Sequence, residues 1–152
     1  MSFTSAEGRQ EILDQLSGAI DRLAEALAFL GAAYERLDEQ RADALEAQLF
    51  RPVQLAYGRA RRTHSEFADR HGLPRASFID PSFGAESQDA IALIERAGDA
   101  ARDADTAIAG LQDSMLPVEV GDQELRAGLS ETRSLIDPVP GLAARFVRTV
   151  GR

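Results

Sequence analysis

The stretch that decides the fold is SAEGRQEILDQLSGAIDRLAEALAFLGAAYERLD, residues 5–38. Its large apolar residues recur at alternating intervals of three and four, which places them on one side of a helix. They are Leu13, Leu16, Ile20, Leu23, Leu27, Leu30, Tyr34 and Leu37. The stretch contains no proline, and Thr4 and Ser5 offer an N-cap hydroxyl ahead of the acidic Glu7. The sequence therefore predicts a long first helix with one buried seam, against which the rest of the chain packs as further helices.

A second helix is expected over residues 43–71, opened by an acidic version of the capping box that begins at Asp43. Pro52 lies inside this helix. Because proline lacks a backbone donor and crowds the preceding turn, we expect a kink or brief break near Phe50. Gly72 can adopt the left-handed conformation that ends a helix, so it marks the stop.

The second half of the chain predicts two more helices. One covers residues 87–114, with Ser87 as its N-cap and a face made mostly of alanine, which allows a neighbouring helix to approach closely. The other covers residues 122–136 and is interrupted by the proline-rich turn 137–141 before a basic amphipathic piece, residues 142–150. We interpret these last pieces as one broken helix that completes the bundle, and a free basic tail able to lie on a membrane as the alternative.

These elements predict a single all-α domain covering residues 1–152. We expect an antiparallel up-down-up-down four-helix bundle with a broken fourth helix. Residues 74–86 carry turn residues at both ends and large apolar residues between them, so we expect an ordered crossover packed on the bundle.

Composition excludes several classes of function. The net charge of −8 opposes a nucleic-acid-binding surface, because phosphate backbones require a positive face. The chain has no cysteine, which removes thiolate chemistry and fits a cytoplasmic protein. No run of apolar residues is long enough to span a membrane, so we expect no stable membrane association.

Arginines concentrate on the second predicted helix. Residues 51–75 contain six arginines against two acids, and four of the arginines share the helix face opposite the apolar residues. These four are Arg51, Arg59, Arg62 and Arg70. One interpretation is that acids of neighbouring protomers or helices, notably the acidic third helix, screen them. The other is a contact with an anion or an acidic partner through the guanidinium forks.

Two further groups are candidate contact residues. Phe29 is expected on the side of the first helix opposite the leucines, where it is either an ordinary exposed aromatic residue or the anchor of a homodimer or partner contact. Phe78, Ile79 and Phe83 of the crossover are candidates for a lid over a ligand pocket near the helix break at 137–141.

The sequence contains few residues or motifs that suit catalysis. His64 and His71 are the only histidines; seven residues apart, they lack a third ligand between them, so we expect core-edge or helix-end histidines and no metal site. No phosphate-binding glycine loop or nucleophile motif occurs, and we expect no cofactor. The sequence therefore favours a non-enzymatic protein that acts through protein–protein interaction and self-associates as a homo-oligomer. The alternative is a small-ligand-binding bundle.

Overall fold

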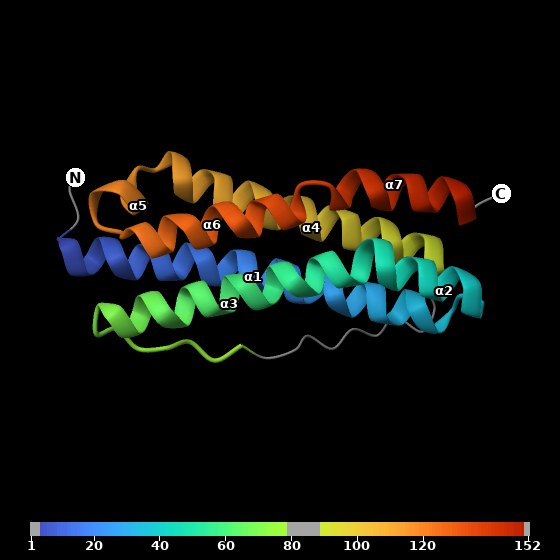
Figure 1. Ribbon diagram of the computed structural model, residues 1–152, viewed down its shortest axis with the longest axis horizontal. Helices are drawn as coiled ribbons and strands as arrows, with labels where there is room; N and C mark the ends of the chain where they lie inside the picture. The colour runs from blue at the N-terminus through green and yellow to red at the C-terminus, as the bar shows by residue number, and fades with distance from the viewer. Residues whose placement is uncertain (1–3, 79–88, 151–152) are drawn as a thin grey trace.

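The structure is a computed structural model that describes residues 4–78 and 89–150, and all of its regular elements are helical (Figure 1). Within these ranges no strand occurs, which confirms the all-α prediction. The elements are α1 (Ser5–Glu35), α2 (Glu39–Leu45), the π-helical turn η1 (Glu46–Phe50), α3 (Arg51–Arg70), α4 (Ala90–Asp113), α5 (Leu116–Glu119), α6 (Gln123–Ile136) and α7 (Val139–Val150).

Local side-chain chemistry sets the helix starts. The Thr4 hydroxyl accepts a hydrogen bond from the Glu7 amide at 3.1 Å, as the capping pattern predicts. The predicted start of the second helix at Asp43 is wrong. Asp38 is the N-cap instead, because its carboxylate accepts from the Arg41 amide at 2.9 Å and so begins the helix earlier. The predicted N-cap of the third helix, Ser87, is also wrong: the N-cap of α4 is Asp89, whose carboxylate accepts from the Ala92 amide at 2.8 Å.

Pro52 disturbs its helix without breaking it. The π-helical turn η1 lies immediately before the proline, and the amide of Arg51 bonds to the Glu46 carbonyl five residues back. One widened turn accommodates the missing donor and the bulk of the ring. The expected irregularity near Phe50 is therefore confirmed, and α2, η1 and α3 form one continuous helical rod (Figure 1).

The helices are antiparallel to their neighbours, but the predicted up-down-up-down chain order is wrong. Ser17, early in α1, lies 2.9 Å from the ring of His64, late in α3. Arg9 at the start of α1 donates to the carbonyl of Val120, which follows α4 and α5. Both α3 and α4 thus run opposite to α1, so the order is up-down-down-up (Figure 1).

Chain length explains this order. A helix as long as α1, with 31 residues, is about 46 Å long. The connection of residues 71–89 reaches about 60 Å when extended, at about 3.3 Å per residue. A connection of this length exceeds the length of α1, which allows α4 to start at the same end of the bundle as α2 (Figure 1).

The fourth rod is broken as predicted, but the predicted turn over residues 137–141 is too long, because α7 already begins at Val139. Pro140 fits in the first turn of α7, where a helix needs no backbone donor. The rod consists of α6 and α7, separated by Asp137 and Pro138. Val139, Ala143 and Phe146 of α7 are buried, and Val150 packs against the core. The C-terminal helix therefore completes the bundle, which confirms the broken-helix interpretation over the free-tail alternative.

Candidate functional site

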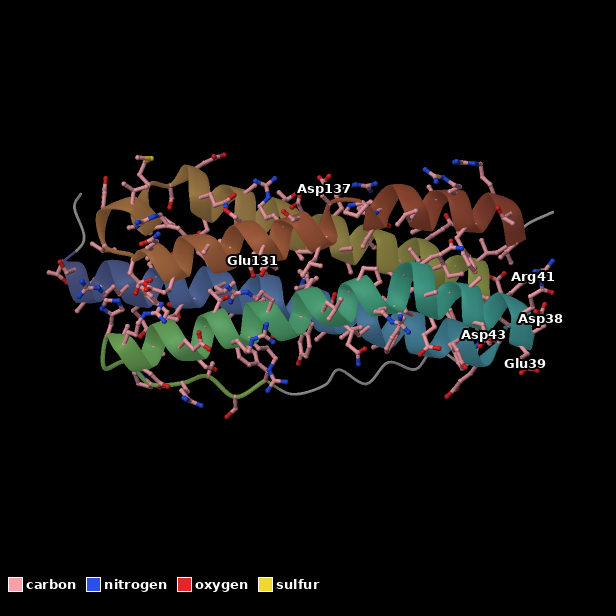
Figure 2. All side chains as sticks on the ribbon, in the orientation of Figure 1. Asp38, Glu39, Arg41, Asp43, Glu131 and Asp137 are labelled. Carbon is pink, nitrogen blue, oxygen red and sulfur yellow. The ribbon has the colours of Figure 1, made fainter. Side chains whose placement is uncertain are left out.

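Of the four arginines predicted to share one helix face, two form ion pairs with acids among the described residues and two do not. Arg70 holds Asp122 with two hydrogen bonds of 2.8 and 2.9 Å, and Arg59 pairs with Glu131. Asp122 is the N-cap of α6 and Glu131 lies within that helix, and Figure 2 shows Glu131 between α6 and α3. The expectation that the acidic third helix screens the arginines is therefore wrong: α4 lies diagonally across the bundle from α3, and α6 is the neighbour. Arg51 and Arg62 remain exposed and form no ion pair with the described residues.

Asp122 is the centre of the strongest polar cluster. Burial alone would raise the pKa of its carboxyl, but hydrogen bonds from Arg70, the Leu125 amide and His71 outweigh burial and lower the pKa to about 2. The same carboxylate is the N-cap of α6. This cluster joins the end of α3 to the start of α6, which makes it structural.

Phe29 is not the exposed residue that the sequence predicts. It is buried, with 6% of its surface exposed, and the guanidinium of Arg96 lies over its ring at 4.9 Å. The single-seam helix assumed for α1 is the cause of the error, because α1 packs against both α3 and α4 and buries two sides. Phe29 is therefore no anchor for a partner.

The proposed lid and the helix break lie on different sides of the bundle. Phe78 packs edge-on against His64 of α3, with ring centroids 5.3 Å apart. The break at Asp137 lies at the opposite side of the bundle (Figure 2). Ile79 and Phe83 fall outside the described residues. The structure therefore does not unite Phe78 and the helix break in one pocket.

The two histidines have separate environments. His64 is buried with its Nε2 atom 2.9 Å from Ser17 Oγ, and its Nδ1 atom has no hydrogen-bond partner among the described residues. Burial lowers the pKa of His64, against smaller upward contributions from the Leu13 backbone and the Asp14 carboxylate. His71 lies 3.0 Å from Asp122. Among residues 4–78 and 89–150, no three acidic or histidine side chains gather to hold a metal ion.

A surface groove lies between α7 and the segment formed by α2 and η1. These helices are at the end of the bundle opposite α5 (Figure 1). The groove has a volume of about 760 Å³. Its apolar wall comes from Ala44 with Leu142, Phe146 and Val150, and its polar lining comes from both helices. The polar residues are Asp38, Gln40, Arg41, Gln48, Arg145 and Thr149. Figure 2 shows Asp38 and Arg41 at this end of the molecule.

The groove exists because the bundle is tight in one half and open in the other. In the tight half, Gly128 of α6 lies against Thr63 of α3, where a Cβ atom would stand 2.2 Å from the Thr63 hydroxyl oxygen. Beyond the break, α7 packs chiefly on α4, where a Cβ at Gly98 would lie 3.2 Å from Ala143. This leaves a gap between α7 and α2.

The sequence reveals only half of this groove. The basic, acid-free segment after Pro138 is visible as an amphipathic piece that contains Arg145. Nothing in residues 38–48 marks them as the facing wall, because the pairing of α2 with α7 follows from the chain order. The proximity of Arg41 to α7 is therefore a result of the tertiary structure.

Comparisons with known proteins assign this chain to no family. No family model, no curated protein and no solved structure matches the chain. Within the part of the chain that the structure describes, no helix is long and apolar enough to cross a membrane.

Proposed function

We propose that this protein is a non-enzymatic binding protein that accommodates an acidic amphipathic helix of a protein partner in the groove between α2 and α7. The observation that carries the proposal is the lining of this groove, in which an apolar wall lies beside Arg41 and Arg145. Helices bind in grooves by burying apolar side chains and matching charge at the rim.

The charge pattern supports an acidic partner. α7 contains Arg145 and Arg148 and no acid, on a chain whose net charge is −8. Arg41 is paired at 3.4 Å with Asp38, and both side chains are about half exposed, so this pair is weak. A carboxylate of a partner helix can therefore gain contacts with both arginines at little cost.

The shape supports a helix. α2 and α7 run antiparallel, and the space between two neighbouring helices is the position that a further helix occupies in ridges-into-grooves packing. The half-buried Ala44, Leu142 and Val150 already pack on the core and would form the floor. Self-association is the special case in which a second copy supplies the helix.

A small amphiphilic anion is the second candidate, because a volume of about 760 Å³ lies in the range of small-molecule sites. The helix proposal is tested with a photo-crosslinking residue at Thr149 in intact cells, followed by identification of the captured protein. Arg145→Glu should abolish capture, whereas Arg148→Glu, an exposed change on the same helix outside the groove, should preserve it.

Two results would count against the helix proposal, and a third would limit it to a different protein as partner. Equal capture by both variants would indicate non-specific crosslinking. A small molecule retained in native mass spectrometry and lost in Arg145→Glu would favour the second candidate. A wild-type monomer in light scattering would remove the self-association case. A cytoplasmic location is part of the proposal and is checked by cell fractionation.

A further inference from the structure

A second hollow, of about 430 Å³, lies on the outer side of α3 beside the start of the connection to α4. It is lined by Gly58, Arg61, Arg62, Ser65, Glu66 and Arg75. This set differs from the arginine face that the helical wheel predicts, because Arg59 and Arg70 turn to α6. We propose that this arginine hollow binds a phosphate group.

The guanidinium of Arg61 is held in place by two aromatic rings. Its guanidinium carbon lies 5.3 Å from the centroid of the Tyr57 ring and 5.7 Å from that of the Phe78 ring. Phe78 is itself held against His64. Yet no N–H of Arg61 takes part in a hydrogen bond or ion pair with the described residues. Two rings therefore orient a planar fork whose donors are unused, which reduces the entropy lost when an anion binds.

The other arginines add charge at the same place. Arg62 is exposed and also lacks a hydrogen-bonded partner among the described residues. Arg75 is held by both carboxylate oxygens of Asp69, which fixes its guanidinium beside the hollow. The lining contains one acid, Glu66, and Asp69 beside it compensates the charge of Arg75, so Arg61 and Arg62 carry the uncompensated charge.

The balance of charge and donors selects the ligand. The three arginines, Glu66 and the Asp69 that pairs with Arg75 sum to a charge of about +1, so the hollow attracts an anion such as a phosphate monoester, which carries about −1.5 to −2 near neutral pH. A phosphate also offers three acceptor oxygens to several guanidinium groups, whereas a single carboxylate offers two. The shared chemistry includes free phosphate and phosphorylated small molecules.

The test is a titration of protein labelled with ¹⁵N in its arginine side chains, followed by NMR of the Nε–H signals. Inorganic phosphate, glycerol phosphate and acetate are added separately, each against sodium chloride of equal ionic strength. We expect saturable shifts of Arg61 and Arg62 with both phosphates. Tighter binding of the monoester would identify a phosphorylated small molecule as the ligand, and equal binding would identify free phosphate.

Variants distinguish phosphate binding in this hollow from non-specific electrostatic attraction to the protein surface. Arg61→Gln should weaken phosphate binding by at least about tenfold, the effect of losing a charge-assisted contact. Arg61→Lys should also weaken it, because lysine keeps the charge without the stacked fork. Arg51→Gln is the matched control, since Arg51 is exposed on α3 outside the hollow. Shifts reproduced by chloride, equal loss in the control, or equal affinity for acetate would each overturn the proposal.

Discussion

Gly128 of α6 and Thr63 of α3 are in such close contact that a Cβ atom on Gly128 would lie 2.2 Å from the threonine hydroxyl oxygen. That hydroxyl is fixed from its own helix, donating to the Arg59 carbonyl at 2.8 Å and accepting from the Arg59 guanidinium at 2.9 Å. Thr63 therefore cannot move away freely, and glycine is required at position 128.

Gly128→Ala should therefore destabilise the protein by about 1–3 kcal/mol, the usual cost of overpacking a tight contact. Gly18→Ala is the matched control, because a Cβ there meets nothing within 4 Å and alanine stabilises an exposed helical position by about 0.5–1 kcal/mol. Urea unfolding of the two variants measures both effects. Equal changes in the free energy of unfolding of the two variants would show that the α3–α6 contact does not disfavour alanine at position 128.

The Asp122 cluster predicts a pH-dependent contribution to stability. The pKa of Asp122 is about 2 in the folded protein against an ordinary value of 3.8, so this contribution is fully present above pH 4. It is lost as the pH falls through about 2. Asp122→Asn retains an N-cap side chain but removes the charge, and should cost about 2 kcal/mol at pH 7.

The free energies of unfolding of wild type and Asp122→Asn should converge between about pH 4 and pH 2. Asp89 provides the control, because it caps α4 through the Ala92 amide and pairs with no arginine in the part of the chain that the structure describes. Asp89→Asn should therefore change stability by only a few tenths of a kcal/mol. A difference that persists unchanged at pH 2 would contradict the role of the Asp122 charge.

His64 predicts a second pH effect in a different range. Because burial lowers its pKa below the ordinary 6.5, the unfolded chain binds a proton more readily than the folded one. The free energy of unfolding should therefore decrease as the pH falls below about 6.5. His64→Gln should remove this slope, and NMR titration of the His64 ring should give a pKa below 6.5; a value above 6.5 would reverse the sign.

Deletion of residues 138–152 should lower stability by several kcal/mol, because it removes the buried Val139, Ala143 and Phe146. Phe146→Ala alone should cost about 3–5 kcal/mol, whereas Arg148→Ala, on the exposed side of α7, should stay within about 0.5 kcal/mol. Thermal unfolding monitored by circular dichroism distinguishes them. An unchanged melting temperature after the deletion would mean that α7 does not complete the core.

Much of this protein is determined by local sequence. The three- and four-residue spacing of Leu13 to Leu30 specifies α1, Pro52 places an irregular turn before it, and Gly72 ends α3 with φ of +66°. These features follow from backbone geometry and hydrogen bonding over a few residues, so they can be predicted without knowing the neighbours of each helix.

Tertiary packing determined which side chains are buried and which residues pair between helices, because local periodicity does not specify the neighbours of each helix. Phe29 is buried because α1 has two neighbouring helices, and a helical wheel drawn for one seam places it in solvent. Arg59 pairs with α6 because the chain order puts α6, and not α4, beside α3. The α2–α7 groove depends on the same order, because its two walls come from residues 38–48 and 142–150, which only the tertiary structure brings together.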